Sequence, residues 1–228
     1  MTQSRTYSRY AIYDLPEDSQ LAEAGACWLG WDAIHGKFVQ QPEFSDIEAA
    51  TTTPGKYGFH ATLKPPFRLA DGCSVDSLSE AVAKLAAQQS AAECNGLQVS
   101  NLGKFLALTP VGDTDAIDCL AVRCVKELDH FRAPLNESEL ARRRATSLTE
   151  RQENYLQQWG YPYVADEFNY HITLTGKLRE HELQHWSDIA CNHFSLPCPY
   201  LINSLALVGE RDSGEFELIS RYRLTGNK

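Results

Sequence analysis

Two stretches of the chain decide the interpretation, Tyr57-Gly58-Phe59-His60-Ala61-Thr62-Leu63-Lys64 and Phe168-Asn169-Tyr170-His171-Ile172-Thr173-Leu174-Thr175. They align without gaps, and each contains a His-x-Thr-Leu motif. The two histidines lie 111 positions apart (171 − 60), close to half of the 228 residues. An internal repeat with this spacing predicts two related lobes.

Both motifs have the alternation of a strand whose two faces differ in chemistry. Because successive side chains of a strand point to opposite faces, one face is polar and the other is apolar or aromatic. The polar set is His60, Thr62, Lys64, His171, Thr173 and Thr175. The pattern therefore predicts a core face and a cleft face in each strand, with the first strand ending before Pro65-Pro66.

The polar set is suited to hydrolysis of a phosphodiester. Two imidazoles with ordinary pKa values near ~6.5 can serve as general base and general acid at neutral pH. Threonine hydroxyls can hydrogen bond the non-bridging phosphate oxygens. We therefore predict His60 and His171 as catalytic, Thr62 and Thr173 as phosphate-binding, and Lys64 and Thr175 as further substrate contacts. The scheme requires no metal and no cofactor.

A single motif of this kind also suits the solvated face of an ordinary half-buried sheet. Its repetition with matched flanking elements favours a functional pair. A helix and two strands follow each motif, predicted over 77–89, 97–100 and 105–109 in the first half and 180–192, 204–208 and 215–222 in the second. Ser77 and Glu80 are expected to form a capping box at the start of the first helix.

The remaining patterns complete an α+β chain. Further helices are predicted over 19–29, over 115–130 with Asp115 as N-cap, and over 149–159 with Thr149 as N-cap and Gly160 as its end; 7–13 is an opening strand. We expect one bilobal domain over 1–228, with its repeat around 57–109 and 168–222. Each lobe would carry a small, mainly antiparallel sheet with outer helices, and a cleft would lie between the lobes.

Composition limits the partners. The formal net charge of -9 argues against a protein that holds long nucleic acid, since that requires a surplus of Lys and Arg. Seven scattered cysteines form no zinc pattern, and no segment has the length and apolarity of a signal peptide or membrane span. We expect a cytoplasmic monomer, without membrane contact, that binds a small phosphorylated substrate.

Two other features have the composition of a binding site. Arg142-Arg143-Arg144 is a basic run that suits either a phosphate or solvent, and solvent is the simpler interpretation. His181 and His185 have the i,i+4 spacing of a metal pair, but no Glu occupies the position that H-E-x-x-H requires. We therefore predict no metal site.

Further stretches extend a family resemblance over nearly the whole chain. They are Arg9 to Tyr13 (RYAIY), Tyr57 to Phe67 (YGFHATLKPPF), Phe131 to Leu135 (FRAPL), Leu140 to Arg144 (LARRR) and Trp159 to Val164 (WGYPYV). With the duplicated motif, the chain resembles the two-histidine, LigT-like phosphoesterases, in the branch found in bacterial phosphonate-utilisation operons. The resemblance implies a bilobal fold, catalysis by the two histidines and a cyclic phosphodiester substrate such as a phosphoribosyl cyclic phosphate. It also implies substrate contacts from Arg132 and Tyr163.

Two other functions remain open. The same chemistry could act on RNA ends that carry a 2′,3′-cyclic phosphate, which predicts binding that weakens steeply with salt. A non-catalytic module could use the same side chains to bind a phosphorylated ligand, although such modules usually rely on Arg or a helix N-terminus.

Overall fold

A computed structural model describes residues 6–226. Its centre is a seven-stranded sheet in which every neighbouring pair is antiparallel. In sheet order the strands are β11 (Phe216–Arg223), β10 (Ser204–Glu210), β1 (Tyr10–Asp14), β4 (Ala61–Phe67), β8 (Ile172–Thr173), β7 (Leu106–Val111) and β6 (Gly96–Asn101). Two small sheets pair β2 (Trp31–Asp32) with β3 (Lys37–Phe38) and β5 (Ala92–Cys94) with β9 (Tyr200–Ile202).

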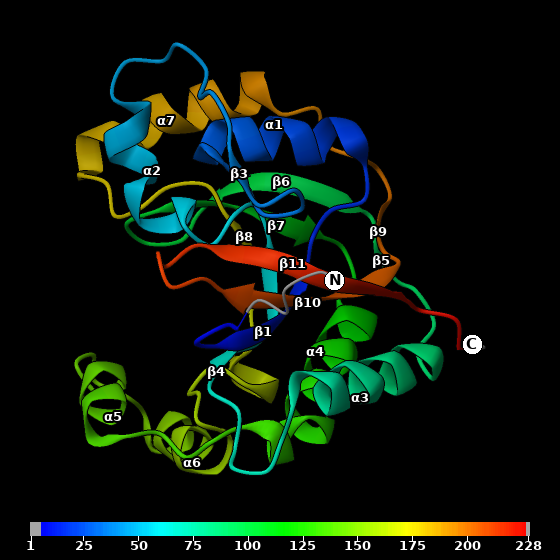
Figure 1. The fold of residues 1–228 in the computed structure, drawn as a ribbon. Helices are drawn as coiled ribbons and strands as arrows, with labels where there is room; N and C mark the ends of the chain where they lie inside the picture. The colour runs from blue at the N-terminus through cyan, green and yellow to red at the C-terminus, as the bar shows by residue number, and fades with distance from the viewer. Residues whose placement is uncertain (1–5, 227–228) are drawn as a thin grey trace.

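The helices cover the sheet from two sides (Figure 1). They are α1 (Ser19–Leu29), α2 (Ile47–Gly55), α3 (Val75–Ala87), α4 (Asp115–Glu127), α5 (Glu137–Arg143), α6 (Glu150–Trp159) and α7 (Glu180–His193). α3 packs on β10 and β11 and α4 on β4, whereas α7 packs on β6 and β7. Figure 1 shows α1, α2 and α7 together on one side, and α3 and α4 on the other. The expected α+β class, with antiparallel sheets and outer helices, is confirmed.

The helix ends follow local chemistry that the sequence pattern indicates only in part. Thr149 caps α6, and Gly160 ends it in the left-handed conformation, as predicted. The capping box of α3 is formed by Ser74 and Ser77, so the prediction of Ser77 with Glu80 is wrong by one turn. α4 has Thr114 rather than Asp115 at its N-cap position.

One residue pair joins two groups of strands into the central sheet. Ala61 of β4 pairs with Ile172 of β8, and no other pair in residues 6–226 links these two strands. On one side of this junction lie β4, β1, β10 and β11, and on the other lie β8, β7 and β6. The grouping does not follow chain order, because β6 and β7 follow the first motif along the chain but lie beside the second.

The pairing of β1 with β4 is interrupted by two shifts in register. Tyr13 pairs with Thr62 and Ile12 with Lys64, so β4 contains one extra residue between these pairs. A second shift separates Ile12 from Tyr10, whose partner is Phe67. Such bulges leave positions without a ladder hydrogen bond, where proline is tolerated. β4 therefore continues through Pro65-Pro66, and the expectation that the strand ends before them is wrong.

Buried side chains form a large cluster and a small one. The large cluster includes Ile12, Leu63 and Ile172 and fills the space between the sheet and its helices. The small cluster includes Tyr13, Val208 and Phe216, with Tyr57 packed against it. Tyr13 and Ile12 are adjacent in β1, so the two clusters lie on opposite faces of the sheet. Within residues 6–226, no helix has the length and apolar character required to cross a membrane.

Candidate active site

The junction between β4 and β8 places both motifs side by side. Ala61 and Ile172 pair directly and are 1% and 0% exposed, so their side chains belong to the core face. The residues on either side of them point to the opposite face. Strand alternation therefore directs His60, Thr62, His171 and Thr173 to one face of the sheet, opposite Ala61 and Ile172.

Both imidazoles are oriented by the same type of hydrogen bond. His60 Nδ1 lies 2.9 Å from the carbonyl oxygen of Gly58, and His171 Nδ1 lies 2.8 Å from that of Asn169. A carbonyl only accepts, so Nδ1 carries the proton in each ring, and Nε2 of the neutral imidazole is left as a base. Gly58 adopts a φ of 73°, a left-handed conformation that favours glycine before the first motif.

His60 is the more enclosed of the two histidines. Its ring stacks on Tyr13, with 3.7 Å between ring centroids, and its Nε2 lies 3.2 Å from Thr62 Oγ1. Burial lowers the pKa of His60 to about 4, and the charge of His171 acts in the same direction, while the hydrogen bond to Gly58 opposes them. His60 is therefore neutral at neutral pH.

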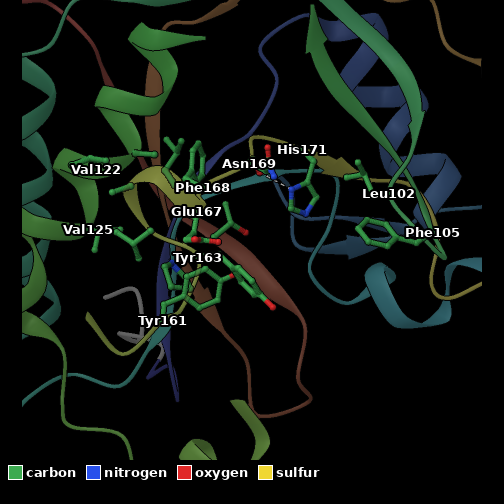
Figure 2. A pocket seen from close by; sticks show the side chains of 16 residues that line it. Leu102, Phe105, Val122, Val125, Tyr161, Tyr163, Glu167, Phe168, Asn169 and His171 are labelled. Carbon is green, nitrogen blue, oxygen red and sulfur yellow. Dashed lines mark hydrogen bonds between the residues drawn. The ribbon is translucent and has the colours of Figure 1, made fainter. Parts of the chain in front are cut away.

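A cavity of about 420 Å³ opens beside Thr62 and His171 (Figure 2). Its walls come from β4, α4, the tip of the β6–β7 hairpin and the segment that precedes the second motif. The lining residues are Thr62, Leu63, Pro65, Leu102, Phe105, Ala121, Val122, Val125, Tyr161, Tyr163, Val164, Ala165, Glu167, Phe168, Asn169 and His171. Figure 2 shows His171 between Phe105 and the tyrosines. The walls are mainly apolar and aromatic, and none of these described residues is Lys or Arg.

Only some of the predicted site residues line the cavity. Thr62, His171 and Tyr163 line the cavity, and Tyr163 is 41% exposed. His60 and Thr173 are not among the lining residues; His60 reaches the cavity's edge through its contact with Thr62.

Lys64, Thr175 and Arg132 are engaged elsewhere in the protein. Lys64 is 1% exposed and its Nζ donates to the carbonyl oxygen of Val125 at 3.0 Å, so the prediction that it faces the cleft is wrong. The bulge that follows Thr62 breaks the alternation on which that prediction was based.

Thr175 and Arg132 have local partners of their own. Thr175 is buried and its Oγ1 accepts a hydrogen bond from the amide of Leu106, because β8 ends two residues earlier. Arg132 donates through Nε to Asp129 at 2.8 Å and through Nη2 to the carbonyl oxygen of Gln158. Neither residue lines the cavity.

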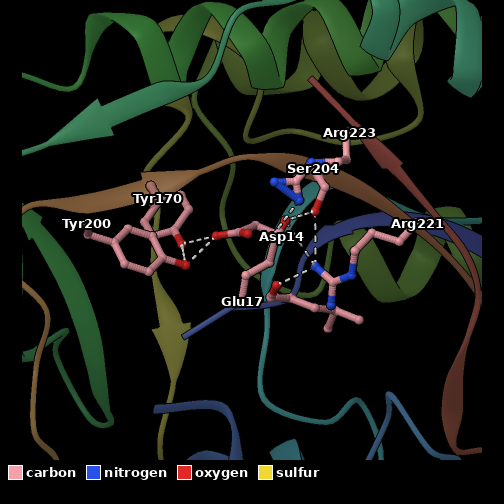
Figure 3. A network of polar contacts seen from close by, with 8 residues as sticks. Asp14, Glu17, Tyr170, Tyr200, Ser204, Arg221 and Arg223 are labelled. Atoms are coloured by element: carbon pink, nitrogen blue, oxygen red, sulfur yellow. Dashed lines mark hydrogen bonds and ion pairs between the residues drawn. The ribbon is translucent and has the colours of Figure 1, made fainter. Parts of the chain in front are cut away.

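A buried polar network lies at the junction between the two strand groups (Figure 3). The hydroxyls of Tyr170 and Tyr200 each donate to Asp14 Oδ2 at 2.6 Å. Asp14 pairs in register with Ala61, and Tyr170 directly precedes His171. Burial raises the pKa of Asp14 to about 6, although the two tyrosine hydroxyls oppose that shift. No sequence pattern pointed to this network, since its members come together only in the tertiary structure.

His181 and His185 lie exposed on α7. Within the described part of the chain, no three His, Cys, Asp or Glu side chains converge as a metal site would require.

The family of the chain follows from a match to residues 62–217, more than half of its length. The matching family is described as "Protein of unknown function (DUF1045)". This chain belongs to the DUF1045 family. The matched region of this DUF1045 protein includes Thr62 and the whole second motif, and begins two residues after His60.

Two curated relatives are longer than this DUF1045 chain. "Ribose 1,5-bisphosphate phosphokinase PhnN" of Janthinobacterium sp. (strain Marseille) is 42% identical over 181 residues, which is 77% of this chain and 40% of the relative. The protein of the same name from Laribacter hongkongensis (strain HLHK9) is 34% identical over 209 residues, 90% of this chain and 49% of the relative. The chain thus spans about half or less of either relative, and its 228 residues contain no G-x-x-x-x-G-K-[ST] phosphate-binding loop.

Solved structures with weak overall similarity include phosphoesterases. LigT of E. coli complexed with 3′-AMP has a TM-score of 0.44 at 16% identity, covering 96% of this DUF1045 chain and 99% of LigT. A structure described as a phosphoesterase has a TM-score of 0.42 at 16% identity, covering 96% and 99% of the two chains.

Proposed function

We propose that this DUF1045 protein is a metal-independent phosphodiesterase that hydrolyses a small cyclic phosphodiester, with His60 and His171 as general base and general acid. The observation that carries the proposal is the junction of the two motifs. A single pair, Ala61 with Ile172, brings both histidines and both threonines to one face. Both imidazoles are held by the same Nδ1 hydrogen bond, which directs Nε2 away from the backbone.

The roles of the histidines differ because their surroundings differ. Burial lowers the pKa of His60 to about 4, so it enters the reaction neutral and can accept a proton. We assign it as the base. His171 lines the open cavity, and we assign its protonated Nε2 as the acid that serves the leaving group.

Hydrolysis then proceeds by a single displacement at phosphorus. His60 Nε2 takes a proton from water as the water oxygen bonds to phosphorus. The phosphorus–oxygen bond to the ring breaks, and His171 Nε2 gives its proton to the departing oxygen. The product is an open-chain phosphomonoester with a free hydroxyl. Thr62 and Thr173 donate hydrogen bonds to the non-bridging oxygens and hold the phosphorus between the two rings.

The volume of the cavity and the lack of cationic side chains in its described walls favour a small substrate over a long nucleic acid. Its volume of about 420 Å³ falls within the range of small-molecule sites. None of its described walls supplies a cation for a phosphate backbone, and the whole chain has a net charge of -9. Among small substrates, we propose a cyclic nucleotide or a phosphoribosyl cyclic phosphate.

The proposal can be tested with a panel of cyclic phosphates in the presence of EDTA. Wild-type protein should open at least one ring, and His60→Ala or His171→Ala should lower kcat/KM by about 10²- to 10⁴-fold each. His181→Ala, an exposed histidine on α7, is the matched control and should keep full activity.

Each alternative predicts a different result in this assay. A binding module would bind a panel member without forming product, and His60→Ala would weaken that binding. An enzyme acting on RNA ends would prefer oligonucleotides, with affinity that falls steeply as salt rises. Lack of turnover with every cyclic phosphate would refute the proposed activity.

A further inference from the structure

The three arginines of the basic run have different surroundings. Arg142 and Arg144 are exposed, and Arg144 Nε donates to Glu153 at 3.1 Å. Arg143, at the end of α5, turns inward and is only partly accessible. The solvent interpretation of the run therefore fits Arg142 and Arg144, and Arg143 needs another explanation.

Among the described residues, no acidic side chain lies within ion-pair distance of the Arg143 guanidinium. Its Cζ lies 4.7 Å from the centre of the Tyr161 ring, which is a cation–π distance. Within residues 6–226, its guanidinium forms no ion pair or hydrogen bond, and its Nε is buried without a partner. Burial lowers the pKa of Arg143, and the charges of Arg142 and Arg9 add to that effect, while Tyr161 and Glu139 oppose it. An unpaired guanidinium in such a place is unfavourable unless a ligand supplies the missing charge.

The position of Arg143 relates it to the active site. Tyr161, whose ring Arg143 contacts, lines the cavity together with Thr62 and His171, so Arg143 lies next to a cavity residue without lining the cavity itself. Arg9, the other nearby cation, is already paired with Glu210. Only Nε of Arg143 is fully enclosed, which leaves the two terminal nitrogens open to a ligand.

We propose that Arg143, supported by Tyr161, binds a second anionic group of the substrate, a terminal phosphomonoester. The inference rests on the proposed function, because it places the phosphodiester of the same molecule between the two histidines. A guanidinium suits this role since its planar fork can donate two parallel hydrogen bonds to a phosphate. The substrate class then narrows to cyclic phosphodiesters that also carry a free phosphate.

Matched ligand pairs that differ only in a terminal phosphate test this subsite. Suitable pairs are 2′,3′-cyclic AMP with and without a 5′-phosphate, and ribose 1,2-cyclic phosphate with and without a 5-phosphate. Wild-type protein should favour the phosphorylated member, by KM and by calorimetric binding. Arg143→Gln should reduce that preference by roughly 10- to 100-fold. The loss should come from weaker binding of the phosphorylated member and not of the unphosphorylated one. Arg142→Gln makes the same change of charge on the exposed neighbour and should preserve the preference.

The calorimetric binding measurement distinguishes failure of the Arg143 subsite from failure of the proposed hydrolase activity. A preference for the phosphorylated member that depends on Arg143, without turnover, would support the subsite while refuting the hydrolase. Turnover with no preference between the members would refute the subsite alone. Equal loss for both members in Arg143→Gln, or binding of neither member to wild type, would also refute the subsite. Arg143→Lys keeps the charge without the fork and should restore only part of the preference.

Discussion

At the scale of single residues, the two histidines have equivalent backbone positions but different surroundings. Each directs Nδ1 to the carbonyl oxygen two residues earlier, but only His60 is stacked beneath a tyrosine. Burial next to Tyr13 favours the neutral imidazole. The surroundings of His60 thus provide the neutral imidazole that the proposed general base requires.

The pH dependence of catalysis should report this difference. A base must be unprotonated, so kcat/KM should fall as the pH drops through the pKa of His60, about 4. The acid limb should therefore lie near pH 4 and be absent from the residual activity of His60→Ala. Circular dichroism at each pH would verify that the protein stays folded. An acid limb near pH ~6.5, the ordinary value for histidine, would contradict the assignment of His60 as the base.

Lys64 should matter for stability and not for catalysis. Lys64→Met removes the hydrogen bond to the carbonyl of Val125 and should lower the free energy of unfolding by about 1–2 kcal/mol. Its kcat/KM should stay within about threefold of wild type, which corresponds to less than ~1 kcal/mol in activation free energy. Thr62→Val, nearly equal in shape and two residues earlier, should show the reverse, with reduced kcat/KM and little change in stability. Loss of turnover in Lys64→Met would show that Lys64 contributes to catalysis and would contradict this account.

At the scale of elements, α1 approaches the first motif closely because Gly25 lacks a side chain. A Cβ at Gly25 would lie 2.1 Å from Cγ of Phe59, the residue before His60. Phe59 is buried and stacks on Phe194, with 5.7 Å between ring centroids. The glycine therefore helps to determine where the first motif enters its strand.

Gly25→Ala should disturb both stability and activity. The gain in helix propensity, about 1 kcal/mol, is smaller than the cost of displacing a packed ring, so we expect a net destabilisation of about 1–3 kcal/mol. kcat should fall because His60 moves with Phe59. Urea unfolding and kinetics would measure the two effects, with Glu23→Ala on the exposed face of α1 as control. A more stable, fully active variant would contradict this account.

The sequence predicted elements well where local signals were strong. The helix over 19–29 coincides with α1, and 180–192 matches α7 to within a residue. α2 and α5 were not predicted, since one contains Pro54 and the other has only seven residues. The orientation of Lys64 was mispredicted because a β-bulge is defined by the pairing partner, which one strand's sequence does not contain.

The site was predictable to the same extent. The repeat indicated two histidines and two threonines, of which Thr62 and His171 line the cavity, and resemblance indicated Tyr163, which also lines it. The partners of Asp14 and the inward orientation of Arg143 depend on tertiary packing, so no local sequence pattern predicts them.

At the scale of the whole molecule, the network around Asp14 joins the two groups of strands. Asp14 belongs to β1, and its partners Tyr170 and Tyr200 precede β8 and begin β9. Its folded pKa of about 6 exceeds the ordinary value of 3.8, so the folded protein binds this proton more tightly than the unfolded chain does. The resulting contribution to stability is complete below about pH 4 and is lost as the pH rises through 6.

Asp14→Asn should remove this pH dependence. The amide oxygen can still accept from both tyrosines, but it does not titrate. Between about pH 4 and pH 7, wild type should lose on the order of 3 kcal/mol more unfolding free energy than the variant. Urea titrations across that range would measure the difference, and Asp18→Asn at the exposed start of α1 provides a comparison. Parallel curves for wild type and Asp14→Asn would refute the account.

The interleaved order of strands has a consequence during translation. β1 and β4 leave the ribosome early, but β8 follows more than a hundred residues after β4, and β10 and β11 come last. A nascent chain therefore exposes its first imidazole long before the second one exists beside it. Under the proposed function, truncated products that stop before residue 171 would lack one of the two histidines and should show no phosphodiesterase activity.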